Sequence, residues 1–278
     1  MTQATHAAAM TEVERPPVPP RPWTTARIIG TLAVAFCILA GIGLVAWLAA
    51  AWRTDFMERW APQYWAGLKV TFYITVASFL IGAVLSIPVA YGRMTTNRFL
   101  SALAYGYVYF FRGTPLIAQT FLIYYGAGSF RPFLDSIGLW WFFREGINCA
   151  IFAFALNTAA YQAEILRGAI QSVPRGQWEG AASLGLSKLQ TMWKVIAPQA
   201  AIVALRPYGN EVILLIKASA IVALVTVLDL MGVTRLAFSR SFDFQTYIWA
   251  GIIYITIVEF LRHTIDWIER RITRHLKR

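Results

Sequence analysis

The chain has 278 residues, of which 58% are hydrophobic and only 14% are charged, and its formal net charge is +11. Soluble domains carry more charge and less apolar content, so this composition excludes an ordinary soluble enzyme and indicates an integral membrane protein. The basic residues gather in short loops and in the C-terminal tail, which is an orientation signal of membrane proteins rather than a groove for nucleic acid.

The N-terminal region predicts a tail followed by a first crossing. Residues 1–27 hold five prolines and show little hydrophobic periodicity, so we expect a disordered cytoplasmic tail. Residues 28–52 run 25 residues without a charge, more than the ~20 that a helix needs to cross a bilayer. A cleaved signal peptide is the alternative, but its apolar core is only about 7–15 residues long. We therefore predict a retained transmembrane helix.

Five more apolar runs follow, and we expect them to cross in alternating directions. An aromatic-rich segment, residues 53–69, is expected to lie on the outer surface. The crossings themselves are expected at residues 70–92, 99–130, 146–170, 201–228 and 245–261. The run at 99–130 is interrupted by Phe111-Arg112-Gly113-Thr114-Pro115, so a helix there should break partway. The loop at residues 131–145 is again rich in aromatic residues and is expected at the membrane interface.

The C-terminal residues 263–278 place apolar residues on one helical face and basic residues elsewhere. This pattern predicts a basic amphipathic tail along the inner membrane surface, which either only orients the last helix or contacts another subunit. Fifteen Lys and Arg residues fall in segments assigned inside and six in segments assigned outside. The excess predicts cytoplasmic termini. The expected fold is an all-α integral membrane protein with about six transmembrane helices.

A polar stretch, residues 174–198, carries the most specific pattern in the chain. Pro174 and Pro198 bracket it, and between them lie the small residues 180–183, then Gly185, then an amphipathic run with apolar residues at helical spacing. Glycine tolerates a positive φ, which a turn between two short helices commonly needs. The stretch therefore predicts a helix, a break at Gly185 and a second helix.

These residues resemble the EAA loop of importer-type ABC transporter permeases, whose pattern is Glu-Ala-Ala, three residues, Gly, nine residues, Ile, one residue, Leu, Pro. Glu179, Ala181, Gly185 and Pro198 match, whereas Gly180, Val195 and Ala197 replace the first Ala, the Ile and the Leu. In that family the loop is a cytoplasmic coupling helix that sits in a groove of the ATPase subunit. The resemblance implies an ATPase-coupling surface made of Glu179, Gly180, Ala181, Ala182, Gly185 and Pro198. The alternative is an ordinary cytoplasmic hairpin whose small residues pack against the chain's own helices.

A second resemblance lies at residues 111–115. Permeases of polar amino-acid importers carry Phe-Arg-Gly-Thr-Pro at this place and follow it, as here, with Leu116, Gln119 and Tyr125-Gly126. Asn148-Cys149, Asn157-Thr158 and Asn210–Leu214 look most like the subfamily for histidine, lysine, arginine, ornithine and opines. The resemblance implies a permease core of five helices within residues 65–262, with residues 28–52 as an extra N-terminal helix.

The same resemblance implies an importer in the bacterial inner membrane for polar, basic amino acids or opines. Such an importer has two ATPase subunits, a periplasmic binding protein and two permeases. One permease would be this chain, and the other would be either a similar subunit or a second copy of this chain. The chain has no Gly-x4-Gly-Lys-Ser/Thr phosphate loop, so ATP and Mg would be bound by the ATPase partner. We expect no enzyme activity, cofactor or metal in this chain. Its expected partners are these subunits and the membrane lipid, and no nucleic acid.

Several polar residues inside the expected crossings are candidates for a substrate pathway. Glu211 falls ten residues into the crossing at 201–228, and a charge near mid-membrane seldom faces lipid, so it should face the interior. It is either a pathway carboxylate for a cationic substrate, aided by Asn210, or a structural ion pair with Lys217, Arg206 or Arg112. The other pathway candidates are Asn157, Glu164 and Ser219, of which Glu164 is the weaker because Arg167 one turn later offers a local partner.

Two other protein classes would also place charges within the membrane, namely a secondary transporter and a channel subunit. Many secondary transporters show internal repeats, and none is found in this sequence. Neither class would account for the pattern at residues 174–198. An importer permease is therefore the favoured interpretation.

Overall fold

The computed structural model describes residues 24–50 and 54–276, and this described part is helical, without a strand. The chain divides into two units, residues 1–53 and residues 54–278. The described part of the first unit is α1 (Thr25–Ala50), which is long and apolar enough to cross a membrane. It contains residues 28–50 of the charge-free run predicted at 28–52, and residues 51 and 52 lie outside the described residues. Most of the predicted N-terminal tail, residues 1–23, lies outside the described residues.

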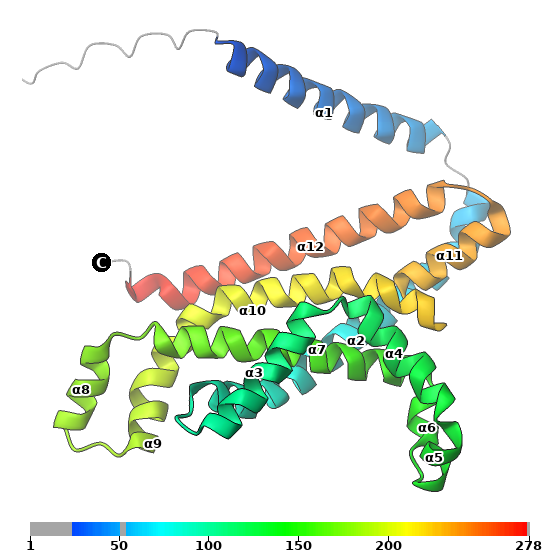
Figure 1. Cartoon of the computed structure of the whole chain (residues 1–278). Helices are drawn as coiled ribbons and strands as arrows, with labels where there is room; N and C mark the ends of the chain where they lie inside the picture. Colours follow the sequence, from blue (N-terminus) through cyan, green and yellow to red (C-terminus); the bar gives the residue numbers. More distant parts are fainter. Residues whose placement is uncertain (1–23, 51–53, 277–278) are drawn as a thin grey trace, which may run out of the picture. The chain divides into compact units, whose positions relative to one another are not determined.

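The second unit holds the other helices (Figure 1). A π-helical turn at Met192–Ile196 leads into α10, and 3-10 turns follow α10 and α12 at Ala220–Val225 and Thr273–Leu276. In chain order the α-helices are α2 (Thr54–Met94), α3 (Arg98–Gly113), α4 (Leu116–Ser129), α5 (Arg131–Ser136), α6 (Trp140–Phe143), α7 (Gly146–Gln171), α8 (Arg175–Ser183), α9 (Lys188–Thr191), α10 (Ala197–Ser219), α11 (Leu230–Ser241) and α12 (Gln245–Ile272).

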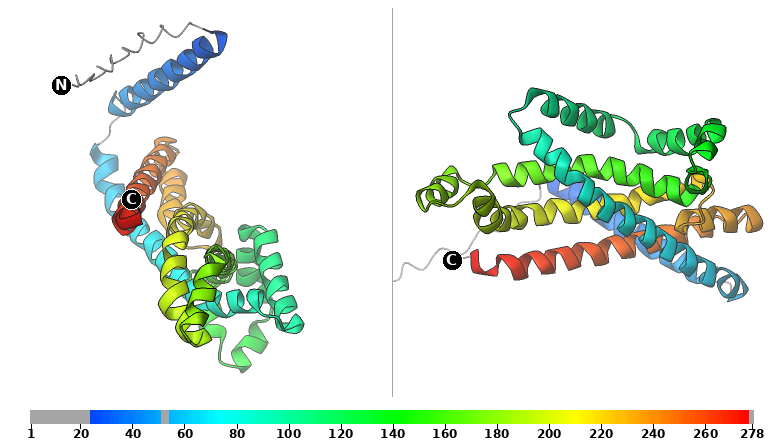
Figure 2. Two further views of the ribbon diagram at one scale, coloured as in Figure 1. Left: turned by 90° about the vertical axis from the view of Figure 1, so that its left-hand side faces the viewer. Right: turned by 90° about the horizontal axis from the view of Figure 1, so that it is seen from below.

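Within this unit the long helices form one bundle with two distinct ends. Helix α7 packs against α2, α3, α4 and α10, and α12 packs against α10 and α11. Figure 1 and the right-hand view of Figure 2 place α8 and α9 at one end, beside the C-terminal end of α12, and place α5, α6 and α11 at the other. We call these the loop end and the far end.

Helix α7 forms the core of the bundle because its side chains are small where other helices approach. Ala153, Ala155, Ala159 and Ala160 are fully buried. Opposite them, α2 presents Gly82, where an added Cβ would collide with the side chain of Thr158. Small residues at such contacts let helix backbones approach closely, which is how helices associate within a membrane.

The outer surface of the bundle is apolar. On α2, for example, Tyr73, Leu80, Val84 and Ile87 are exposed although they lie in the middle of a long helix. Surface of this kind is stable against lipid or another helix, not against water. In the described part of the chain, five helices are long and apolar enough to cross a membrane.

The predicted crossings at 146–170 and 201–228 correspond to α7 and to α10 with its 3-10 turn. The crossing at 99–130 is broken, as predicted, and the break falls at Thr114–Pro115 between α3 and α4. Each of these two helices is too short to span alone, so the count of six crossings stays a prediction.

Two predicted boundaries are not helix ends. The segment 53–69 was expected as a separate surface element, but α2 is continuous from Thr54 to Met94, and residue 65 lies inside it. Likewise α12 continues through Ile272, past the expected end of the last crossing at 261 and into the expected tail at 263–278. Whether this part of α12 lies along the membrane stays a prediction.

Candidate functional site

The loop at residues 174–198 has the predicted shape. Helix α8 ends at Ser183, Gly185 takes a φ of +71°, and the next helix begins after Ser187. Ser187 caps that helix reciprocally with Gln190: the backbone N–H of each residue donates to the other's side-chain oxygen. This box satisfies two N–H groups that a helix start otherwise leaves unpaired. The helix, break and helix expected from sequence are all present.

The loop surface exposes large apolar side chains. Leu184, Leu189 and Trp193 are 80%, 69% and 70% exposed. Among the predicted coupling residues, Ala181 is buried against the chain, whereas Glu179, Gly180, Ala182, Gly185 and Pro198 are exposed. The predicted amphipathic run is divided accordingly, because Ile196 is fully buried while Leu189 and Trp193 face outward. Exposed apolar groups on an otherwise polar loop favour a docking surface.

The base of the loop is fixed to the bundle. Ala169 near the end of α7 and Val173 just after it pack against Ile196 of the π-helical turn and Ala200 at the start of α10. Trp178 of α8 packs against the same cluster. In addition, Gln199 donates a hydrogen bond of 3.2 Å to the side-chain oxygen of Gln177. A displacement of α8 would therefore be transmitted to α7 and α10.

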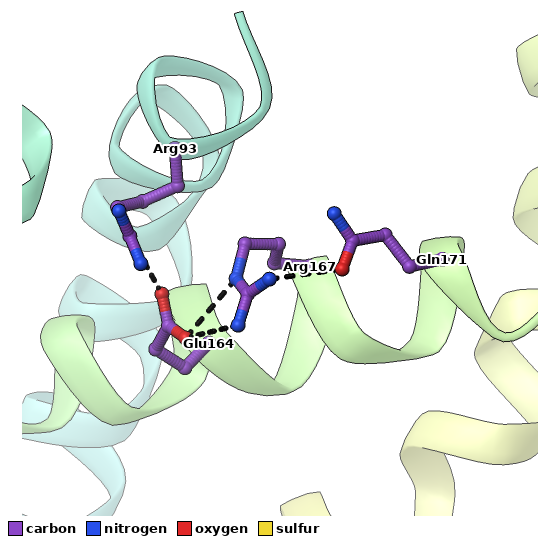
Figure 3. Close-up of polar contacts among 4 residues, drawn as sticks. All are labelled: Arg93, Glu164, Arg167 and Gln171. Atoms are coloured by element: carbon purple, nitrogen blue, oxygen red, sulfur yellow. Dashed lines mark hydrogen bonds and ion pairs between the residues drawn. The ribbon is translucent and has the colours of Figure 1, made fainter. Parts of the chain in front are cut away.

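A charged cluster ties α7 to α2 near the loop end (Figure 3). One oxygen of Glu164 accepts from Nε of Arg93 at 2.9 Å, and the other accepts from Nη2 and Nε of Arg167 at 2.7 and 3.0 Å. Arg167 also donates to Gln171 at 2.8 Å, and the Arg93 guanidinium lies 5.0 Å from the ring centre of Tyr105 on α3. We call these residues the Glu164 cluster.

This geometry bears on the earlier expectation that Glu164 lines the substrate pathway. Its local partner is Arg167, as proposed from the sequence, but Arg93 is a second partner 71 positions away that the sequence did not indicate. The negative charge of Glu164 is already shared by two arginines, so it offers a substrate cation far less than an unpaired carboxylate would. The arrangement argues for a structural role instead.

The break between α3 and α4 is held by amides from α4 and α7. Pro115 has no N–H, so the carbonyl of Phe111, four positions earlier, lacks its helical donor. The Nδ2 of Asn157 donates to that carbonyl at 2.8 Å, and the Nε2 of Gln119 donates to it at 2.9 Å. Asn157 also donates to the Gln119 side-chain oxygen at 3.0 Å. Asn157 is thus committed to positioning the break in α3–α4.

Next to Asn157, α7 contacts the carboxylate of Glu211. Glu211 is 6% exposed and faces the interior, as predicted, where it accepts from the Thr158 hydroxyl at 2.8 Å. Gln162 donates to the same hydroxyl at 3.1 Å, and its own side-chain oxygen is buried without a hydrogen-bond partner among the described residues. These residues form a polar patch between α7 and α10.

The cations proposed as structural partners do not pair with Glu211 among the residues that the structure describes. Arg206 pairs with Glu269 at 3.0 Å, and Lys217 is exposed. Arg112 acts on Glu211 electrostatically but lies over the ring of Tyr161, 5.0 Å from its centre. The carboxylate therefore has one hydroxyl donor and no direct counter-ion.

The other two pathway candidates on α10 are not brought to this patch. Asn210 is exposed, and Ser219 is fully buried with its hydroxyl donating to the Ile216 carbonyl at 2.8 Å. The sequence singled out Thr158 only as part of a resemblance and did not single out Gln162. A glutamine one helical turn after a threonine, both within an apolar run, was the available signal.

Long apolar helices around a buried polar patch, with a polar loop at one end, define a polytopic membrane protein. Residues 78–278 match the family described as binding-protein-dependent transport system inner membrane component. The chain belongs to that family and is an inner-membrane permease component of an ABC importer. This result favours the permease interpretation over a secondary transporter or a channel subunit.

Individual relatives agree with the family. The chain is 42% identical over 217 residues to the nopaline transport system permease protein NocM of Agrobacterium fabrum, covering 78% of this chain and 90% of that protein. It is 34% identical over 215 residues to the arginine ABC transporter permease protein ArtM of Escherichia coli K12, covering 77% and 96%. The crystal structure of an amino acid ABC transporter with histidines contains a chain with a TM-score of 0.69 and 32% identity, covering 79% of this chain and 100% of that one.

Proposed function

We propose that this permease translocates basic amino acids or opines and is powered by a partner ATPase that docks on the loop at residues 174–198. The observation that carries the coupling role is the exposure of Leu184, Leu189 and Trp193 around the break at Gly185. An ordinary hairpin would pack its small residues against its own chain. Of the predicted coupling residues at 179–182, 185 and 198, only Ala181 is buried in that way. ATP and Mg would be bound by the ATPase.

The rest of the assembly follows from the family. We propose two ATPase subunits, a periplasmic binding protein, and a second permease that is either similar to this chain or a copy of it. The excess of Lys and Arg at the segments near the loop end supports a cytoplasmic loop end and cytoplasmic termini. The far end, with α5, α6 and α11, would then face the binding protein.

The substrate proposal rests on relatives and on one side chain. NocM is named for nopaline and ArtM for arginine, and a chain with the same fold comes from an amino acid transporter crystallised with histidines. Glu211 adds a physical reason, because a buried carboxylate without a counter-ion would stabilise a cationic substrate that has lost its hydration. We keep Asn157, Asn210 and Ser219 as weaker pathway candidates.

The docking proposal is tested by replacing Gly185 with valine. A β-branched residue resists positive φ, so the break should distort and the ATPase should no longer copurify. Gly138 is a matched control, because its φ is +70° and, like Gly185, it has nothing within 4 Å of an added Cβ. Gly138→Val should strain the backbone equally at the far end and leave ATPase copurification unchanged.

A second pair of variants separates backbone shape from surface chemistry. Leu184→Ser removes an exposed apolar side chain from the loop, and Leu139→Ser removes one at the far end. We expect only the first to weaken ATPase binding. If Gly185→Val and Leu184→Ser complexes both retain the ATPase and normal uptake, the loop is not the docking surface.

A further inference from the structure

The C-terminal third of α12 extends beyond what is needed to cross the membrane. The 28 residues of the whole helix span about 42 Å, whereas the hydrocarbon core is about 30 Å thick. The helix starts at the far end and finishes at the loop end (Figure 1). Its last turns, from about Trp267 onward, therefore fall at the level of the lipid headgroups.

Charges in these turns are divided between two faces of the helix. Asp266 and Glu269 face α10, where Arg206 lies 3.9 Å and 3.0 Å from their carboxylates. Arg270, Arg271 and Arg274 are exposed. None of these three arginines forms an ion pair with any residue that the structure describes. The acidic side chains are thus used within the bundle, and the basic ones are left facing outward.

The outward face also carries aromatic side chains. Phe260 and Trp267 are seven positions apart, so they lie on one face, and they are 69% and 61% exposed. The Arg271 guanidinium lies 5.7 Å from the ring centre of Trp267. A face that is aromatic toward the membrane centre and becomes basic toward the helix end follows the change from acyl chain to headgroup.

We propose that Trp267, Arg270, Arg271 and Arg274 form a binding site for the phosphate of an acidic phospholipid in the leaflet at the loop end. Guanidinium groups bind phosphate oxygens with paired N–H donors, and indole rings settle at the level of the headgroups. Lipid is favoured over a protein partner because the basic residues continue a face whose exposed aromatics lie along the membrane crossing. The proposal rests on the membrane location of the family and is independent of the proposed substrate.

The test uses the assembled transporter in nanodiscs of phosphatidylcholine with and without phosphatidylglycerol. The variant carries Arg270→Gln, Arg271→Gln and Arg274→Gln, and the control carries Arg131→Gln, Arg144→Gln and Arg240→Gln, which remove the same charge elsewhere on the bundle. Phosphatidylglycerol retained per complex is counted by native mass spectrometry. We expect a drop on the order of fivefold for each arginine that holds the lipid, and no comparable drop in the control.

Two further measurements distinguish the alternatives. Added inorganic phosphate should not displace the retained lipid; displacement would mean that the site binds free phosphate rather than a membrane lipid. The corresponding Arg→Lys variant keeps the charge and membrane orientation, so it should retain more lipid than the Gln variant. The proposal is overturned if lipid retention is equal in all variants, if the control loses as much, or if the Gln variant instead loses its ATPase with lipid retention unchanged.

Discussion

Replacing Glu164 with glutamine would measure how firmly α2 and α7 are held together beside the coupling loop. The Glu164 side chain is 14% exposed, and those of Arg93 and Arg167 are 19% and 29% exposed. Glutamine keeps the size but removes the charge, and its amide N–H₂ would face one guanidinium as donor against donor. A hydrogen bond to a charged group contributes about 1.5–3 kcal/mol. Because all three groups retain some hydration, we expect a loss of about 2–4 kcal/mol.

The assay is thermal unfolding of the purified complex. For a chain of this size, about 3 kcal/mol corresponds to a decrease in Tm of roughly 6–12 °C. Arg98→Gln is the control, because Arg98 is exposed and forms no ion pair within the described part of the chain; its effect should stay within about 0.5 kcal/mol. Since Gln171, the last residue of the cluster, lies three positions before Pro174, Glu164→Gln should also lower uptake more than it lowers ATPase copurification.

A double-mutant cycle isolates the pair that the sequence did not indicate. Arg93→Gln removes one of the two partners of Glu164, and the double variant should be hardly less stable than Glu164→Gln alone. The coupling between Arg93 and Glu164 should be about 1–2 kcal/mol. Additive effects of the two substitutions, or a Glu164→Gln complex as stable as the Arg98→Gln complex, would refute the reasoning.

Four other experiments test separate parts of the structure. Gly146→Ala places a Cβ against the carbonyl of Val225 and should cost about 1–3 kcal/mol, whereas Gly168→Ala in the same helix meets nothing within 4 Å and should be neutral or stabilising in the same thermal assay. Burial raises the pKa of Asp229 to about 6 from 3.8, so the folded state holds this proton more tightly than the unfolded state does. The folded state should therefore lose up to about 3 kcal/mol of stability as pH rises from about 4 to 6. The hydrogen-exchange protection of the first turn of α11, corrected for the pH dependence of the intrinsic exchange rate, should fall over this range, and in Asp229→Asn the corrected protection should not change with pH. Glu211→Gln should abolish uptake of arginine at an unchanged level of assembled complex; unchanged uptake would remove the main residue-level argument for a basic substrate. Deletion of residues 1–52 should leave uptake intact, and mass spectrometry of the purified full-length chain should find those residues retained.

Local chemistry accounts for the parts of the fold that the sequence predicted. A charge-free run long enough to cross a bilayer can bury its backbone only as a helix, which accounts for α1 and for residues 70–92 of α2. A small-residue run precedes Gly185 and an amphipathic run follows it, so the break in the loop was readable from the sequence. Pro115 similarly located the break between α3 and α4.

Helix ends and long-range pairs were not readable in the same way. Hydropathy predicts where the chain leaves the membrane but not whether the helix ends there. Arg and Glu are good helix formers, so α12 continues past residue 261 without a break. The pairing of Arg93 with Glu164, and of Thr158 with Glu211, depends on how the helices pack, and each pair joins residues more than 50 positions apart. A rule based on neighbours one helical turn away could find only Arg167.

The carbonyl of Phe111 has a bearing on the order in which the chain enters the membrane during synthesis. An unpaired carbonyl in hydrocarbon is costly, and a carbonyl oxygen has two lone pairs. Gln119 lies on the same broken segment and supplies one donor, while Asn157 arrives with α7, 46 positions after Phe111, and supplies the other. The broken segment therefore carries its own donor when it first meets lipid and need not wait for α7. Loss of Gln119 should hinder the insertion of α3 and α4, whereas loss of Asn157 should act only later, when α7 packs against them.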